Sequence, residues 1–379
     1  MSRLNVGNLY NENEDGAPVV SGISTFSSPH YFIPPSGTEA ERPSNPGEGM
    51  IRFNTDSGSL EYYRGTHWEN IIVNNNELGG GLNGIGTTNS PQGTGHRGLF
   101  AGGNDPGLRE EIEYISISTL GNSQDFGDLV TPSTGNSGCA SAVRGIFANR
   151  SVPGNSNEID FVTFASTGDA QDFGNAVISA GYRGALSNST RGVIGGGSDP
   201  NAQDEMDYIT ISSTGSAQDF GNLAGGRESP GGAASSVRGI FAGGSASDVI
   251  GYITISSTGD AQDFGDLLAG ATTITGCSNS TRCVFGGIRN PGYVTDMEFI
   301  TIASTGNSQD FGDQTNNRGG AGGAASSTRG VWGGGYGSPA FRTTLDCIEI
   351  ASTGNAVDFG DLTYAADRLA GCSNGHGGL

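Results

Sequence analysis

The sequence has no lysine. Its 18 basic residues are all arginine and stand against 39 acidic residues, so the formal net charge is −21 at pH 7. Proteins that bind nucleic acid present clustered positive charge to the phosphate backbone, so this balance argues against a nucleic-acid partner. The simplest interpretation of the negative charge is solubility and repulsion between copies of an exposed, crowded protein. Bound divalent cations are the alternative, but no EF-hand loop or Gly-Gly-x-Gly-x-Asp run is present, and we predict no metal site and no cofactor.

Cysteine, histidine and long apolar runs are also scarce. The five cysteines are odd in number and include no Cys-x-x-Cys pair, which argues against a disulfide framework and against a zinc site. Cys139, Cys277 and Cys372 lie at or next to a repeated position that is elsewhere alanine or leucine, so we expect buried free thiols. The four histidines share no metal-ligand spacing. Because no apolar run suits a signal peptide or a membrane span, we expect folding in a reducing cytoplasm and no insertion into a membrane.

One phrase of 16 residues, which contains Gln-Asp-Phe-Gly, occurs six times with small variations. Its Asp-Phe pairs begin at Asp125, Asp172, Asp219, Asp263, Asp310 and Asp358, at spacings of 44 to 48 residues. A second phrase, Arg-Gly-(apolar)-Phe-(Ala/Gly)-Gly-Gly, keeps step with it from Arg97 to Arg329. Such a period with a Gly-Gly doublet and alternating strands is typical of propeller blades. We therefore predict an all-β fold with a six-bladed β-propeller over residues 96–379.

Each repeat holds four candidate strands, separated by turn residues. In the third full repeat these strands, with the first strand of the next repeat, are 191–196, 207–212, 217–223 and 231–235. The first repeat lacks a preceding strand of this kind, and the last repeat runs on beyond its fourth strand. We expect residues 367–375 to complete the sheet begun by residues 97–129, which would close the ring and remove an exposed sheet edge.

The N-terminal part has a different composition. Residues 1–49 are polar and contain six prolines, which predicts an extended, irregular arm. Residues 50–73 alternate turn residues with aromatic and β-branched runs and predict a three-stranded β-meander. Residues 74–95 predict a Gly/Asn-rich linker. Because so short a meander buries little core, we expect it to attach to a neighbour or to oligomerise. A trimer would suit a fibre, although the sequence does not determine the number.

Two resemblances add to this interpretation. The Gly102-Gly103 doublet and Tyr114, with their counterparts in other repeats, resemble the kelch repeat, although Ala148-Asn149-Arg150 and Cys347 depart from it. The phrase at 252–267 is similar to kelch-like virion proteins of tailed phages that infect marine cyanobacteria. Residues 49–68 are similar to a hairpin module of phage tail-fibre proteins. The resemblance implies a fibre-like or decorating virion protein, assembled in the host cytoplasm and anchored to other virion proteins through residues 1–73.

No catalytic arrangement stands out. Asp-Phe-Gly resembles the kinase magnesium motif, but no glycine-rich phosphate loop, strand lysine or His-Arg-Asp loop accompanies it. We interpret its Phe as a core residue and its Gly as a bend. Its Asp could pair with the repeated Arg of the second strand and so form a ring of charge-assisted hydrogen bonds. Because no Ser-His-Asp set or special carboxylate pair is present, we predict that the protein is not an enzyme.

The connections differ in how much they vary between repeats. Turns from the first to the second strand and from the third to the fourth barely change, whereas the other connections diverge. In an antiparallel sheet the variable connections all emerge on one face, as in scaffolds that carry recognition, although neutral drift is the alternative. We predict recognition of a host glycan or receptor through Asn104, Asp105, Asn149, Arg150, Asp199, Asn201, Asp248, Arg289, Asn290, Tyr293, Tyr336 and Phe341. The alternative function is a bacterial carbohydrate-binding or carbohydrate-active propeller, which would need an export signal.

Overall fold

The computed structural model describes residues 34–56, 59–70, 96–151 and 154–379 of the chain. Contacts divide the chain into two compact units, Met1–Asn75 and Asn76–Leu379. Within the described ranges the fold is all-β: they contain no α-helix and one short 3-10 helix, η1 (Glu39–Glu41). In the same ranges no helix is long and apolar enough to span a membrane.

The first unit contains a four-stranded sheet. Its strands, in the order in which they pair, are β1 (Ser36–Gly37), β2 (Ile51–Asn54), β3 (Ser59–Tyr63) and β4 (Trp68–Asn70). β2, β3 and β4 form the antiparallel succession expected within residues 50–73. The arm expected over residues 1–49 is not irregular throughout, because β1 pairs in parallel with β2 and η1 follows it. Residues 1–33 of this arm and the predicted linker 74–95 lie outside the described residues.

The two faces of this sheet are unusual in polarity. The buried face carries Arg52 and Glu61, and Glu61 accepts a hydrogen bond from Arg42 at 2.6 Å. That hydrogen bond lowers the pKa of Glu61. The opposite face is mainly apolar and incompletely covered. It carries Ile51, Phe53, Leu60 and Tyr62, with Glu69 beside Tyr62 in β4. The sheet therefore leaves its apolar side available for a further contact.

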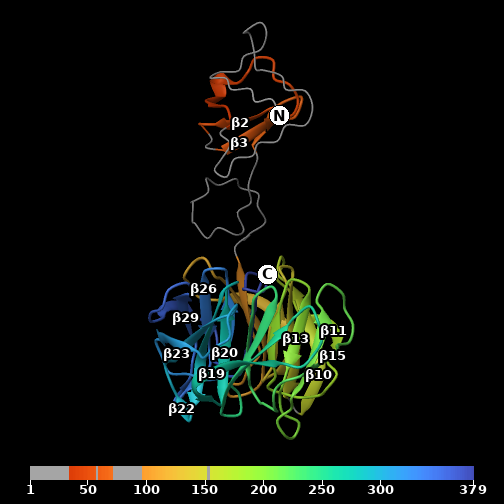
Figure 1. The fold of residues 1–379 in the computed structure, drawn as a ribbon, viewed down its shortest axis with the longest axis vertical. Coiled ribbons are helices and arrows are strands. Elements are labelled where there is room, and N and C mark those ends of the chain that lie inside the picture. The colour runs from red at the N-terminus through yellow and green to blue at the C-terminus, as the bar shows by residue number, and fades with distance from the viewer. Residues whose placement is uncertain (1–33, 57–58, 71–95, 152–153) are drawn as a thin grey trace, which may run out of the picture. The chain divides into compact units, whose positions relative to one another are not determined.

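In its described residues the second unit contains six antiparallel sheets with four main strands each, and one two-stranded sheet. We number them along the chain: sheet 1 (β31, β5, β6, β7), sheet 2 (β8–β11), sheet 3 (β12–β15), sheet 4 (β16–β19), sheet 5 (β20, β21, β23, β24) and sheet 6 (β25, β26, β29, β30). Figure 1 shows labelled strands of sheets 2 and 3 on one side of this unit and those of sheets 5 and 6 on the other.

Strands at equivalent places share their sequence pattern. The first strands are β31 (Ala370–Ser373), β8 (Ser137–Ala140), β12 (Gly184–Ser187), β16 (Gly231–Ala234), β20 (Thr273–Ser278) and β25 (Gly322–Ala325). The second strands are β5 (Arg97–Ala101), β9 (Arg144–Ser151), β13 (Arg191–Gly195), β17 (Arg238–Ala242), β21 (Arg282–Asn290) and β26 (Arg329–Gly333). The last three strands of sheet 3 and β16 lie within two residues of the ranges predicted from the sequence.

The outer two strands complete each sheet. The third strands are β6 (Arg109–Ser116), β10 (Asn155–Thr163), β14 (Glu205–Thr210), β18 (Ser247–Thr254), β23 (Asp296–Thr301) and β29 (Thr344–Glu349). The fourth strands are β7 (Gln124–Ser133), β11 (Gln171–Asn175), β15 (Gln218–Asn222), β19 (Gln262–Ala271), β24 (Gln309–Asp313) and β30 (Val357–Asp361). Short additional strands are β22 (Gly292–Tyr293), β27 (Tyr336–Gly337) and β28 (Ala340–Phe341).

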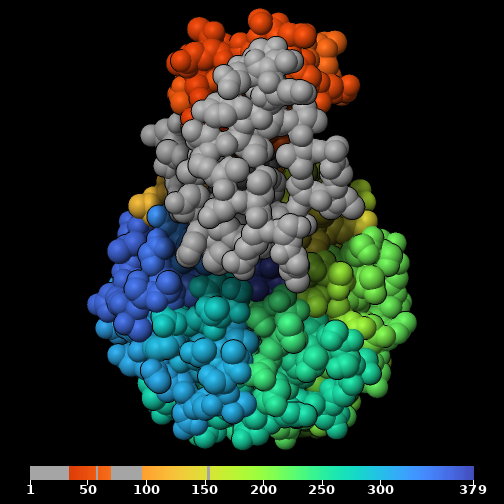
Figure 2. All heavy atoms as spheres, turned by 45° about the horizontal axis from the view of Figure 1, so that its top comes forward, coloured from red at the N-terminus to blue at the C-terminus, as the bar shows by residue number. Residues whose placement is uncertain are grey.

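The last strand belongs to the first sheet. β31 pairs antiparallel with β5, with Ala370 opposite Ala101 and Cys372 opposite Leu99, which is the pairing predicted for residues 367–375. Each first strand also contacts the first strand of the next sheet, and β31 contacts β8. In Figure 2 the colours of the second unit run from green through teal to blue across the visible face, so successive parts of the chain lie beside one another there.

The repeated phrase joins neighbouring sheets. In sheet 2, the N–H groups of Gly168 and Ala170 donate to the carbonyl oxygens of Phe126 and Asp128 in sheet 1, at 2.6 and 2.7 Å. The same pair of bonds occurs at all six junctions, including those from Gly121 and Ser123 of sheet 1 to β30 of sheet 6. The repeated phrase therefore connects the third-to-fourth-strand turn of one sheet to the fourth strand of the preceding sheet. We call this pair of hydrogen bonds the turn-to-strand contact.

The core lies between the sheets. The Phe residues of Asp-Phe-Gly are buried, as predicted, and each hydrophobic cluster combines side chains of neighbouring sheets. Phe100 of sheet 1, for example, packs with Val331 and Leu345 of sheet 6. All five cysteines are buried and free, as expected for thiols that fill small apolar positions. Packing thus links each sheet to the next, and sheet 6 to sheet 1.

The repeated arginine has a different role from the one predicted. The Arg191 guanidinium lies 4.3 Å from the centre of the Tyr208 ring, and its Nη1 donates to the carbonyl of Ile255 in the next sheet at 2.9 Å. Equivalent bonds to a carbonyl of the next sheet are made by Arg97, Arg144, Arg238, Arg282 and Arg329. The predicted ring of Arg–Asp pairs is therefore wrong. The guanidinium groups donate to backbone carbonyls instead. The Asp of Asp-Phe-Gly, such as Asp219, is exposed at the start of the fourth strand.

In most sheets a buried carboxylate precedes the repeated aromatic position of the third strand, which in sheet 6 holds Cys347. These residues are Glu113, Asp160, Asp207, Glu298 and Asp346, while sheet 4 has Gly251. Each carboxylate accepts a backbone N–H from the fourth strand of the preceding sheet or from just beyond it, as Asp207 does from Val177 at 3.0 Å. These bonds are a further connection between neighbouring sheets.

The second partner of this carboxylate depends on its length. Glu113 accepts from Ser123 at 2.7 Å, and Glu298 accepts from Ser308 at 2.6 Å. The shorter aspartates pair instead with arginines: Asp160 with Arg150, Asp207 with Arg183 and Asp346 with Arg318. In the sheets with aspartate, alanine replaces the serine. Arg183, in the connection that leads into sheet 3, and Arg318, in the connection that leads into sheet 6, are therefore structural.

Candidate functional site

The variable connections lie on one face of the second unit. Connections from the second to the third strand bond to those from the fourth to the first, for example Gly197 N–H to the Arg227 carbonyl at 2.7 Å and Gly335 N–H to the Ala366 carbonyl at 2.7 Å. Both sets therefore occur at the same ends of the strands. We call this the variable-loop face. The repeated turns, and the entry of the chain into β5 at Arg97, lie at the opposite ends of the strands.

Sheets 5 and 6 bring aromatic side chains together on this face. The β21–β22 hairpin carries Arg289 and Tyr293, and the β27–β28 hairpin carries Tyr336 and Phe341. The Tyr293 and Tyr336 ring centres are 5.2 Å apart, those of Tyr336 and Phe341 are 5.1 Å apart, and both pairs meet edge to face. The Arg289 guanidinium lies 5.5 Å from the centre of the Tyr293 ring. We call these four half-buried residues the aromatic cluster.

Polar side chains hold the two hairpins in register. Asn317 donates from Nδ2 to the Tyr293 carbonyl at 3.5 Å, and its Oδ1 accepts from Nη2 of Arg342 at 3.1 Å. Gly319 lies directly against the Tyr293 ring, because a Cβ built there would be 3.1 Å from two ring carbons. The cluster therefore rests on backbone, and its support includes Arg342, which sequence reasoning missed.

A cavity of about 120 Å³ opens beside the cluster, and the beginnings of the first strands of all six sheets line it. At its rim, the Tyr182 hydroxyl accepts a hydrogen bond from Nη1 of Arg368 at 2.9 Å, and the guanidinium lies 4.9 Å from the ring centre. Arg368 also packs on Gly320, since a Cβ there would be 3.3 Å from Arg368 Cγ. The aromatic cluster and the cavity rim are thus adjacent through Gly319 and Gly320.

The rim residues occupy one repeated position, nine residues after the Phe of Asp-Phe-Gly. This position is filled by Gly135, Tyr182, Ser229, Thr273, Gly320 and Arg368. Tyr182, Ser229 and Arg368 adopt positive φ values of 59°, 59° and 56° there, a conformation that side chains other than glycine rarely adopt. Backbone bonds join several neighbours, such as Tyr182 N–H to the Gly135 carbonyl at 3.0 Å. Aligning the repeats would have shown this position as variable, which is the signal that sequence reasoning overlooked.

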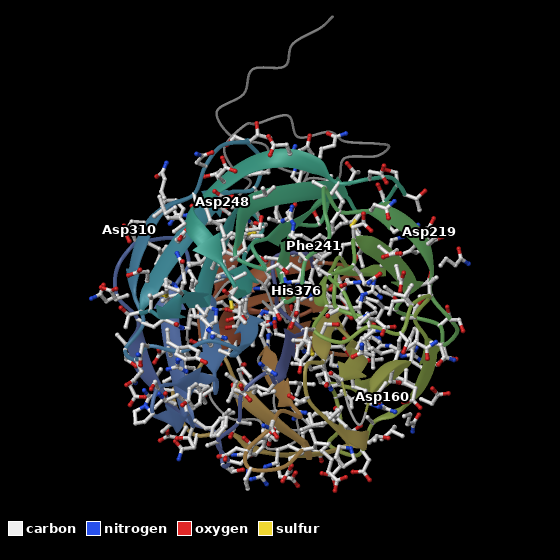
Figure 3. The ribbon with its side chains drawn as sticks, turned by 90° about the horizontal axis from the view of Figure 1, so that it is seen from below. Asp160, Asp219, Phe241, Asp248, Asp310 and His376 are labelled. Carbon is white, nitrogen blue, oxygen red and sulfur yellow. The ribbon has the colours of Figure 1, made fainter. Side chains whose placement is uncertain are left out.

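The other end of the first strands is filled by residues 376–378. His376 Nε2 lies 2.9 Å from the Ala140 carbonyl, and Gly377 N–H donates to the Ser278 carbonyl at 2.8 Å. Figure 3 shows His376 near the middle of the second unit, with Asp219 and Asp310 toward its outer edge. Burial lowers the pKa of His376. Its contacts are with backbone and Ser187, so it belongs to the packing of the strands.

The remaining predicted residues do not form a second group. Asp199 and Asn201 are exposed on the β13–β14 connection, Asp248 is exposed in β18, and Asn104, Asp105 and Asn290 are partly exposed. Two of the predicted residues are buried. Asn149 donates to the Ser156 and Ile178 carbonyls, and Arg150 pairs with Glu158 and Asp160, so both side chains serve the fold and do not face a ligand.

The structure and the comparisons with known proteins give no sign of a metal centre in the described residues or of a known family. Among the residues that the structure describes, no group of three or more His, Cys, Asp or Glu is arranged to hold a metal ion. Burial raises the pKa of carboxyl groups such as that of Glu113, which lies between sheets and does not line the cavity. No protein-family model matches the chain, and no curated protein matches it.

Proposed function

We propose that this protein is a non-enzymatic phage virion protein, fibre-like or decorating, that displays its variable-loop face for recognition of the host surface. The observation that carries the proposal is the division of labour within each repeat. The invariant residues are used in contacts between sheets, whereas the divergent connections gather on one face and bring Tyr293, Tyr336 and Phe341 together. Rigid scaffolds usually carry recognition in this way.

The finer architecture is part of the same proposal: the six sheets are blades of a kelch-like β-propeller. Turn-to-strand contacts between sheets 6 and 1 support it, as do the packing of Phe100 on Val331 and the pairing of β31 with β5. The pairing of β31 with β5 covers the edge of β5, which an open array of sheets would leave exposed. A closed ring also holds the variable connections at fixed positions around the cavity.

We propose further that the N-terminal region anchors the protein to other virion proteins and to copies of itself, with a trimer as one fitting arrangement. Supporting this is the apolar sheet face, on which Ile51 is 53% exposed. Native mass spectrometry of the full chain should show an oligomer that Ile51→Glu reduces. Leu120→Glu, at a residue 59% exposed in the second unit, should leave the mass unchanged. A monomeric wild-type chain would refute self-association.

Binding of the fluorescently labelled full chain to intact marine cyanobacterial cells tests the recognition function. We expect saturable binding that is lost when residues 288–296 are exchanged for the equivalent connection of another repeat, and a parallel exchange of residues 198–206 tests the other exposed loops. If neither exchange changes binding or infectivity, recognition by this face fails and a purely structural role remains.

The alternative function, a bacterial carbohydrate-binding or carbohydrate-active propeller, shares the aromatic cluster with the first. It predicts association with the producing bacterium and, for the active form, release of reducing sugar ends from a polysaccharide. Immunodetection of the chain in purified virions would distinguish the two. A chain found in virions supports the first proposal, and a chain found only on bacteria supports the alternative.

A further inference from the structure

Two arginines beside the aromatic rings have no carboxylate partner in the part of the chain that the structure describes. Among the described residues, neither Arg289 nor Arg342 lies within 4.0 Å of a carboxylate oxygen. Arg109, on the corresponding connection of sheet 1, pairs with Glu111 at 3.3 Å. In a chain with a net charge of −21, two unpaired guanidiniums on neighbouring loops are a local concentration of positive charge.

Both guanidiniums are held at the aromatic cluster. Arg289 lies over Tyr293, and Arg342 is fixed by Asn317, which also bonds to the backbone of Tyr293. Nε of Arg342 is buried and has no acceptor within the described part of the chain. A buried donor without a partner is unfavourable, so this N–H is available to an acceptor, such as an anionic group or a water molecule, that reaches the hairpin.

The third arginine in this region extends the arrangement to the cavity. Arg368 packs on Gly320, next to the Gly319 that supports Tyr293. Its side chain is 46% exposed, and its weak contact with Asp367 is 3.7 Å long. Aromatic and guanidinium groups therefore follow one another from Phe341 to Tyr182, across the connections of sheets 5 and 6 and the rim of the cavity.

We infer that this strip binds an acidic glycan, a sugar chain that carries carboxylate or sulfate groups. Guanidinium groups bind such anions through paired, charge-assisted hydrogen bonds. Half-exposed rings pack against the C–H faces of sugars by dispersion. An extended chain fits the succession of sites better than a compact ligand would. The inference rests on the proposed recognition function and names the chemistry of its ligand.

The test uses the full chain and three polymers of one backbone: dextran, carboxymethyl-dextran and dextran sulfate. In low-salt buffer we expect binding to one or both charged polymers and at least about tenfold weaker binding to dextran, since a hydrogen bond to a charged group is worth roughly 1.5–3 kcal/mol. Arg289→Gln and Arg342→Gln should each weaken binding about tenfold. Arg289→Lys keeps the charge but loses the paired donors, so it should recover only part of the binding that Arg289→Gln loses. Arg109→Gln is the matched control and should leave binding within about twofold.

Several results would overturn the inference. They are equal binding of dextran and the charged polymers, no binding of either charged polymer, or unchanged affinity in Arg289→Gln and Arg342→Gln. Thermal melting of each variant separates loss of binding from loss of fold. If one of these results is obtained and the protein still binds cells, the proposed recognition function remains, with a neutral glycan or a protein as the ligand. Loss of cell binding in the loop exchanges is independent of this test.

Discussion

Replacing Gly360 by alanine tests the junction between sheet 6 and sheet 1. A Cβ on Gly360 would lie 2.5 Å from the carbonyl oxygen of Gly121, where the N–H of Gly121 donates to Phe359. Its φ is +145°, which also strains any residue other than glycine. Gly121 has a similar φ of +153° but open space around its Cβ, so Gly121→Ala isolates the backbone strain.

The expected magnitudes differ between the two variants. Backbone strain costs roughly 1–3 kcal/mol in each. Crowding adds roughly 1–3 kcal/mol in Gly360→Ala only, because the obstacle is backbone and cannot rotate away. Gly265→Ala and Gly306→Ala repeat the comparison at the junction of sheets 4 and 5, with a Cβ at 2.5 Å from Gly306 in the first and open space in the second.

Urea unfolding, followed by far-UV circular dichroism and the fluorescence of buried Trp332, measures all four variants. A closed ring predicts that Gly360→Ala loses more stability than Gly121→Ala, by the same margin as Gly265→Ala exceeds Gly306→Ala. If the excess appears only between sheets 4 and 5, sheets 6 and 1 are apart in solution and the ring is open.

Three further predictions concern the same framework. Asp207→Asn should destabilise the fold by roughly 3–5 kcal/mol in urea unfolding, because it leaves the fully buried Arg183 without a counter-ion; a loss below about 1 kcal/mol would contradict this. Burial raises the pKa of Asp160 to about 6, so its charge reduces stability above that pH and has no effect well below pH 4. Asp160→Asn should therefore raise stability at pH 7.5, by up to about 3 kcal/mol, and not at pH 3.5. The sign differs from that of Asp207→Asn because Arg150 keeps Glu158 as a counter-ion, and a variant less stable at pH 7.5 would refute this expectation. Removing residues 369–379, which include β31, should lower the melting temperature of the whole second unit, and unchanged melting would mean that β31 does not hold sheet 1.

Much of the fold could be predicted because the same sequence pattern occurs six times in the chain. A residue that recurs six times at one spacing, such as Phe220 and its counterparts, must occupy equivalent places, and burial is the simplest reason for an apolar one. The pairing of β31 with β5 followed from one strand missing at the start and one left over at the end. Repetition thus identified the strands, the core and the partner of the last strand.

The partners of repeated polar residues could not be obtained in the same way. Arg191 and Asp219 have the same period, but period alone does not show which way a side chain points or that a carbonyl of the next sheet, that of Ile255, is nearer. The buried carboxylates were within reach. Glu113 occurs with Ser123, and Asp207 occurs with Ala217 and Arg183, so comparing repeats for paired changes would have indicated the contacts.

The aromatic cluster was predicted as separate loop residues and not as a group. Tyr293 and Tyr336 belong to insertions that differ between repeats, so no shared spacing relates them. They meet because sheets 5 and 6 are neighbours and both connections form short hairpins. Only the structure supplies that proximity, and it also removes Asn149 and Arg150 from the exposed surface.

The central claim is that the variable-loop face recognises the host, and binding of full-length variants to cyanobacterial cells tests it most directly. Tyr293→Ala combined with Phe341→Ala changes that face. Val143→Ala combined with Val237→Ala changes apolar residues that are 60% and 63% exposed on the repeated turns of the opposite face. The account predicts that the first pair weakens cell binding at least about tenfold and the second leaves it within about twofold, with melting unchanged in both. Equal binding by both pairs, or loss only in the second, would contradict it.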